Sequence, residues 1–199
     1  MSVSVDYYFI LNSPWSYMAN VQLPELLHRH NVELNLKPVR MAPLLEATGG
    51  LPLAKRSPQR KAYRLQELGR WARRLNIPLT LEPAFFPVDE RLAVGVLIAA
   101  IEDGHDGLEL AETFGAAIWV QDNNLADEAV IGEILASEGL PSLLINEGRD
   151  ASIDQVLDRN TEEALAAGVF GVPTFVVGNH VFWGQDRLDF LEEAIRQAG

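Results

Sequence analysis

The sequence predicts an α/β fold in two small halves, a β-α-β unit and a β-β-α unit, separated by a large all-helical insertion. Strand-like runs over residues 5–11 and 32–39 flank a helical segment near the N-terminus. Two further β-rich runs surround Gly178-Asn179 near the C-terminus and precede a final helical pattern. The residues between these halves repeat their apolar positions at helical spacing.

The first half begins with a run of aromatic and β-branched residues over 5–11, which predicts a buried strand. Ser13 is a favourable helix N-cap and Pro14 suits the first helical position, so a helix is expected from Pro14 to about His30. Pro24 lies inside this helix and is expected to kink it. A second strand over 32–39 completes a strand–helix–strand unit, which favours a parallel pair.

The middle of the chain is expected to be helical. Residues 40–54, which contain Gly49-Gly50, are interpreted as a loop, as are residues 79–88 with their three prolines. Ser57-Pro58 resembles another cap-and-proline helix start, and that helix should end near Asn76. The remaining helical patterns cover residues 92–101, 107–119, 126–138 and 149–167.

The C-terminal half contains two short runs of strand-forming residues, 174–177 and 180–183, around a Gly178-Asn179 turn. This pattern is typical of a β-hairpin. A last helix should then begin at Gly184-Gln185-Asp186. A β-α-β unit followed by a β-β-α unit is the minimal thioredoxin-like arrangement. We therefore expect a thioredoxin-like domain of residues 1–44 and 166–199 and a helical insertion domain of residues 45–165.

The composition excludes several classes of function. The sequence has no cysteine, so it forms no disulfide, thiolate metal site or redox dithiol, and any thiol chemistry requires a borrowed thiol. A net charge of -12 argues against non-specific binding of nucleic acid. The chain has neither a long apolar run nor a signal-like start, so we expect a cytoplasmic protein with no membrane contact. The four scattered histidines show no metal-binding spacing, so no metal is expected.

Positive charge is concentrated in residues 37–74. This segment contains ten Lys and Arg residues against only Glu46 and Glu67, whereas the chain as a whole is acidic. Such a segment is either a solvated basic helix face or a local attraction for small anions such as a carboxylate. The sequence leaves both interpretations open.

The strongest candidate for chemistry is Ser13, at the start of the first predicted helix. Free backbone N–H groups and the positive end of the helix dipole favour an anion at this place, and a thiolate is such an anion. One charge-assisted hydrogen bond contributes roughly 1.5–3 kcal/mol, which lowers a thiol pKa from about 8.5 by one to two units. The alternative is that Ser13 only caps the helix.

Two further positions could face this helix start. Val172-Pro173 directly precedes a strand and fits a cis-proline, which would expose the backbone of Val172 to an extended peptide such as glutathione. Asp186 is a natural N-cap for the last helix. Alternatively, Gln185 and Asp186 bind the charged end of such a peptide.

At these residues the chain resembles the 2-hydroxychromene-2-carboxylate isomerases, which are relatives of the kappa-class glutathione transferases in the DsbA-like thioredoxin group. The resemblance spans nearly the whole chain and is densest over residues 6–20, 169–175 and 182–188.

The resemblance implies glutathione as the cofactor. It implies that Ser13 is the catalytic serine that stabilises the glutathione thiolate. It also implies that the backbone of Val172, beside Pro173, pairs with the cysteinyl part of glutathione. Gln185 and Asp186 resemble the pair that holds the γ-glutamyl end.

On the substrate side, the resemblance implies a substrate-binding role for Arg40, Gly50 and Phe86. Arg40 lies near the place of a substrate-binding cation. Gly50 stands where the family usually has an asparagine, and Phe85 or Phe86 replaces a tyrosine. The substrate side is therefore expected to be less polar than in the family.

The implied reaction interconverts a cyclic hydroxychromene carboxylate, or a related aromatic enone acid, with its trans-benzylidenepyruvate by reversible thiolate addition. The implied setting is aromatic-compound degradation by a homodimer. The alternatives are a kappa-like transferase that consumes glutathione and a non-catalytic glutathione- or peptide-binding protein. A Ser-His-Asp hydrolase centred on Ser13 lacks a matched histidine. The lack of cysteine excludes disulfide exchange.

Overall fold

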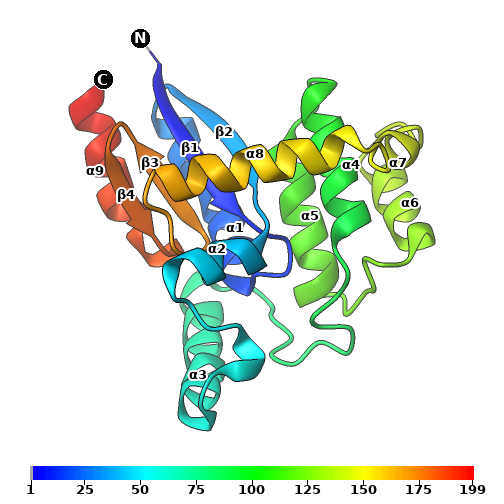
Figure 1. Cartoon of the computed structure of the whole chain (residues 1–199), viewed down its shortest axis with the longest axis horizontal. Coiled ribbons are helices and arrows are strands. Elements are labelled where there is room, and N and C mark those ends of the chain that lie inside the picture. The colour runs from blue at the N-terminus through cyan, green and yellow to red at the C-terminus, as the bar shows by residue number, and fades with distance from the viewer. Residues whose placement is uncertain (1) are drawn as a thin grey trace.

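A computed structural model describes residues 2–199 and contains one four-stranded mixed sheet in the order β2-β1-β3-β4 (Figure 1). Strand β1 (Val3–Phe9) runs parallel to β2 (Val32–Pro38) and antiparallel to β3 (Thr174–Val177). Strand β3 pairs with β4 (His180–Trp183) as a hairpin. The first strand and the terminal hairpin therefore share one sheet, as predicted.

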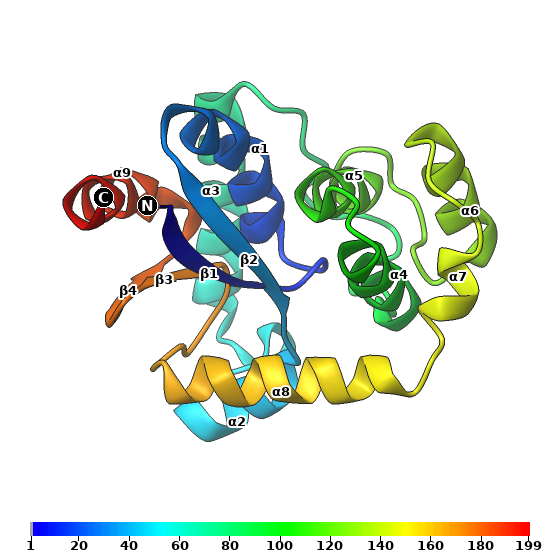
Figure 2. The same cartoon turned by 90° about the horizontal axis from the view of Figure 1, so that it is seen from above.

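Helices cover both faces of this sheet (Figure 2). Helices α1 (Pro14–Arg29) and α9 (Leu188–Ala198) lie on one face, and α8 (Ser152–Ala166) lies on the other. Successive side chains of β1 point to opposite faces of the sheet. Tyr7 belongs to the larger core cluster, which contains Leu23 of α1 and Leu191 of α9, and Tyr8 belongs to a separate cluster with Ala164 of α8.

Helix α1 is tied directly to β1. The buried Tyr7 hydroxyl donates to Asn20 Oδ1 at 2.7 Å, and Asn20 is itself 1% exposed. A buried polar pair of this kind is stable only when its hydrogen bonds are satisfied. This hydrogen bond fixes the N-terminal part of α1 over the sheet. The helix continues through Pro24.

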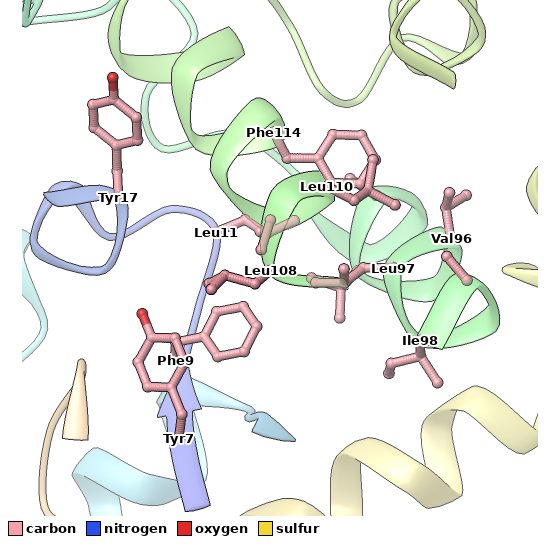
Figure 3. Packing of buried hydrophobic residues seen from close by; sticks show 14 of the residues in the cluster. Tyr7, Phe9, Leu11, Tyr17, Val96, Leu97, Ile98, Leu108, Leu110 and Phe114 are labelled. Atoms are coloured by element: carbon pink, nitrogen blue, oxygen red, sulfur yellow. The ribbon is translucent and has the colours of Figure 1, made fainter. Parts of the chain in front are cut away.

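The central helices are α3 (Pro58–Leu75), α4 (Arg91–Glu102), α5 (Gly107–Trp119), α6 (Glu128–Ser137) and α7 (Leu144–Glu147). Buried side chains of α4 and α5, including Leu97 and Phe114, form one continuous core with Phe9 of β1 and Tyr17 of α1 (Figure 3). The division into a thioredoxin-like domain and an insertion domain remains a prediction. Among residues 2–199, no helix is long and apolar enough to cross a membrane.

The sequence interpretation was wrong in the segment 40–54, which contains helix α2 (Met41–Thr48) and a 3₁₀ turn, η1 (Leu53–Lys55). Pro43 falls in the first turn of α2, where a backbone N–H has no partner within the helix, so it does not disrupt the helix. Gly49 is the left-handed residue that ends α2, with φ 74°, rather than part of a loop. The interpretation also missed the short helix α7.

Candidate functional site

A cleft of about 560 Å³ lies between α3 and the segments around β3 and β4. It is lined by the predicted site residues Val172, Pro173, Gln185 and Asp186, and by Trp15 from the first turn of α1. Three larger surface grooves, of about 600, 750 and 900 Å³, contain none of the predicted site residues. The cleft therefore brings together four of the predicted site residues, whereas Ser13 does not itself line it.

Ser13 is the N-cap of α1, next to Trp15 of the cleft. Its Oγ accepts a hydrogen bond from the Ser16 N–H at 3.2 Å, and the residue is 7% exposed. The Ser13 hydroxyl proton has no acceptor among residues 2–199. The capping role and a donor role are therefore compatible, because the cap uses an oxygen lone pair and leaves the O–H free.

The loop before β3 presents the backbone of Val172. The Val172–Pro173 peptide bond is cis, as the sequence predicted. The Pro173 carbonyl accepts from the Gly184 N–H at 2.9 Å, and the Thr174 hydroxyl donates to the Gly171 carbonyl at 2.7 Å. Within the described chain, neither the N–H nor the C=O of Val172 has a hydrogen-bond partner. The loop is held on both sides of Val172, whose own backbone groups are left unpaired.

The start of the last helix differs from the prediction. Residues Gln185–Arg187 form a 3₁₀ turn, η2, and α9 begins at Leu188 with no side-chain cap. Asp186 is therefore not the N-cap of α9, because it lies within η2 and Arg187 is the residue that precedes α9. Its carboxylate instead lies 2.9 Å from Arg187 Nη1. Capping of the last helix therefore does not explain the presence of Asp186 at this position.

Gln185 is buried, with 3% of its surface exposed, at the boundary between the cleft and α1. Its Oε1 accepts from Gln22 Nε2 at 2.8 Å, which links η2 to α1. The preceding Gly184 has φ 113°, a conformation that a side chain would strain. The position of Gln185 is thus fixed by its neighbours, and its amide NH₂ has no partner within residues 2–199.

The three predicted substrate-side residues do not gather in the cleft. Arg40 pairs with Asp154 at 2.5 Å and Asp158 at 2.6 Å on α8, and Gly50 follows the end of α2. Neither residue lines the cleft. The ring of Phe86 packs against Trp119 and lies next to Arg64, a residue that does line it. The substrate-binding roles of Arg40, Gly50 and Phe86 stay predictions.

The basic segment 37–74 is interpreted either as a solvated face or as a local attraction for anions, and different parts of it fit each interpretation. Arg56, Arg60 and Arg64 line the cleft. Arg73 and Arg74, near the end of α3, are exposed to solvent. One part of the segment is therefore a solvated face and another part faces the candidate site.

Sequence reasoning missed Glu90, which holds the loop that presents Ser13. The Asn12 N–H donates to Glu90 Oε2 at 2.6 Å, and the Asn12 side chain bonds to the backbone N–H and C=O of Val88. Burial raises the pKa of the Glu90 carboxyl to about 7. No local pattern could reveal this contact, because its partners lie 78 positions apart.

We expect Glu90→Gln to change the pH dependence of stability. Because its pKa in the folded protein exceeds the ordinary value, Glu90 lowers the free energy of unfolding as pH rises from about 4.5 to 7. Glutamine keeps an acceptor for the Asn12 N–H and does not titrate. The variant should therefore exceed the wild type by about 1–3 kcal/mol at pH 8 and match it near pH 4.5. Urea unfolding across this range measures the difference, and a difference that is constant with pH would contradict the expectation.

Comparisons with known proteins place the fold in a defined class. Residues 4–196 match the DSBA-like thioredoxin domain. The chain is 31% identical to the 2-hydroxychromene-2-carboxylate isomerase of Sphingobium xenophagum, across 96% of this chain and 97% of that protein. The isomerase of Pseudomonas putida is also 31% identical, across 96% and 93%. The chain belongs to the 2-hydroxychromene-2-carboxylate isomerase family within the DsbA-like thioredoxin class.

Solved structures agree with this assignment. A 2-hydroxychromene-2-carboxylate isomerase has a TM-score of 0.83 and 26% identity, covering 98% of this chain and 95% of that one. The disulfide reductase DsbM of Pseudomonas aeruginosa, solved with GSH, has a TM-score of 0.71 at 16% identity, over 98% and 100% of the two chains, and shares the fold. Glutathione S-transferase kappa 1 of Caenorhabditis elegans is a more distant relative, 24% identical across 97% of this chain and 91% of that protein.

Proposed function

We propose that this protein is a glutathione-dependent isomerase that interconverts a cyclic hydroxychromene carboxylate, or a related aromatic enone acid, with its trans-benzylidenepyruvate. The observation that carries the proposal is the unpaired backbone of Val172 in a cleft shared with Gln185, Asp186 and the first turn of α1. The isomerases among its relatives support the reaction class.

The residues of the cleft fit glutathione in shape and in charge. A volume of about 560 Å³ lies within the usual range for small-molecule sites. The free N–H and C=O of Val172 match the backbone of an extended peptide, and the Asp186 carboxylate matches an ammonium group. The cleft arginines match carboxylates.

In this proposal Ser13 holds the thiol group in its ionised form. Glutathione, when bound, supplies a thiolate that adds reversibly to the conjugated double bond of the substrate and so permits rotation. Ser13 donates its free O–H toward that sulfur, and the N-terminal end of α1 stabilises the negative charge. Gln185 and Asp186 fix the γ-glutamyl end. The chain has no cysteine, so none of its own side chains can supply the thiol.

The aromatic side chains of the cleft suit a planar ring. Trp15, Tyr63, Trp71 and Trp183 all line it and offer faces for stacking. A protein that uses glutathione in this way works where the tripeptide is abundant and reduced, so the proposal includes a cytoplasmic location. It also includes the homodimer that the resemblance implies.

The proposal is tested by incubating the purified protein with hydroxychromene carboxylate, with and without glutathione, and measuring product mass. We expect a product of unchanged mass, a rate that depends on glutathione, and full recovery of the tripeptide. A product heavier by one glutathione would show the kappa-like transferase instead. Binding without turnover would show a binding protein, and isomerisation at an equal rate without glutathione would overturn the cofactor assignment.

A further inference from the structure

Within the described chain, three arginines of the cleft pair with no carboxylate, as do four exposed arginines outside it: Arg73, Arg74, Arg159 and Arg196. Arg60 and Arg64 lie one turn apart on α3, and Arg56 precedes the helix at the same spacing. Elsewhere Arg29, Arg40, Arg70, Arg91, Arg149 and Arg187 each pair with a carboxylate. Among residues 2–199, no carboxylate pairs with Arg56, Arg60 or Arg64, although the sequence has 28 acidic residues.

The acidic side chains of the same cleft are already engaged. Glu67 pairs with Arg70, and Asp186 pairs with Arg187. Arg56 donates to the Leu51 carbonyl, which carries no net charge. Like charges that are partly removed from water without a counter-ion are unfavourable, so an anion that enters the cleft would be stabilised there.

Arg64 differs from the other two because aromatic rings hold its guanidinium group. Its Cζ lies 5.4 Å from the centre of the Phe86 ring and 5.7 Å from that of Trp119. Trp119 is fully buried at the end of α5, so its ring, which contacts Arg64, does not move freely. Burial, followed by the nearby charge of Arg56, lowers the pKa of Arg64 to about 10, so it remains a cation at neutral pH.

A guanidinium group held against aromatic rings is arranged to receive a planar anion. Cation–π contacts restrict its orientation without using its N–H donors, which remain free for a bidentate carboxylate. A lysine cannot reproduce that paired geometry. Arg40 is less suited to this role, because Asp154 and Asp158 already neutralise it outside the cleft.

We propose that Arg64, held by the Phe86 and Trp119 rings, determines the specificity of the cleft by binding the carboxylate of an aromatic acid substrate. This inference rests on the proposed function, because it names the group that holds the substrate of the same reaction. It assigns the anion to a side chain that the sequence patterns did not single out.

The test uses trans-cinnamate as a planar aromatic acid and cinnamamide as its neutral isostere, with binding measured by calorimetry. The wild type should bind the acid at least tenfold more tightly than the amide. Arg64→Met should lose about ten- to a hundredfold in affinity for the acid and little for the amide. Arg64→Lys should fall between them. Arg73→Met, on an exposed part of α3 outside the cleft, is the matched control and should bind both ligands as the wild type does.

The outcomes separate the two proposals. Equal affinity of the wild type and Arg64→Met for cinnamate would overturn the role of Arg64 and leave the isomerase proposal standing. Equal affinity of the wild type for acid and amide would overturn it as well, even if Arg64→Met failed to fold. Failure of the wild type to bind any aromatic acid would count against both proposals. Circular dichroism and thermal midpoints verify that each variant is folded.

Discussion

Ser13→Ala should lower kcat/KM for the glutathione-dependent isomerisation about three- to thirtyfold at pH 7. The free Ser13 hydroxyl is expected to contribute one hydrogen bond to a thiolate, and its loss raises the thiol pKa by about one to two units. The thiolate fraction at pH 7 falls by about three- to thirtyfold if the wild-type pKa is about two units below that of a free thiol. Steady-state rates measured across pH 6 to 10 therefore should show a defect that shrinks as the thiol ionises without assistance.

The control for this variant separates capping from chemistry. Ser13 is also an N-cap, so its replacement should cost about 0.5–2 kcal/mol of stability. Asp127→Ala removes the N-cap of α6, which accepts from the Ala129 N–H at 2.9 Å and lies outside the cleft. It should destabilise the protein to a similar degree without changing the rate. A rate defect in Ser13→Ala that did not vary with pH would mean that the serine acts only on structure.

Gly95→Ala should destabilise the protein by about 3 kcal/mol or more, the largest effect on stability that we expect. A Cβ atom at Gly95 of α4 would lie 2.0 Å from the Gly148 carbonyl oxygen, which is backbone and cannot rotate away. A Cβ at Gly148 would in turn lie 2.5 Å from the Val96 nitrogen. Overpacking of this kind costs roughly 1–3 kcal/mol and more where backbone must move.

Gly132→Ala in α6 is the matched control, since its nearest neighbour would lie 3.9 Å away. It should be neutral or stabilise the protein by about 0.5–1 kcal/mol, because alanine favours a helix. Urea unfolding of both variants measures the contrast. Similar midpoints for the two variants would show that α4 and the chain after α7 can separate at low cost.

Local chemistry made much of the fold predictable. Ser13-Pro14 and Ser57-Pro58 each begin a helix as expected, and the Gly178-Asn179 turn forms the hairpin. Such signals depend on neighbours in sequence. The segment 40–54 differs from its prediction because glycine and proline are typical of loops but also occur at helix ends. In fact Gly49 ends a helix and Pro43 lies in its first turn.

The residues of the candidate site were predictable only where they lie at the ends of strands of the sheet. Val172 and Gln185 flank the terminal hairpin, so the fold brings them together. The contact of Glu90 with Asn12 and the pairing of Arg40 with α8 depend on packing between distant segments. The sequence showed a basic segment, but only the docking of α3 determines that Arg64 faces the cleft.

The central claim is that the helix start at Ser13 ionises a bound glutathione thiol. The direct measurement is an ultraviolet titration of the thiolate of glutathione bound to the wild type and to Ser13→Ala. We expect a pKa well below the value of about 8.5 for a free thiol in the wild type, and one that is one to two units higher in the variant. A wild-type value near that of the free thiol, or identical values in the two proteins, would contradict the account.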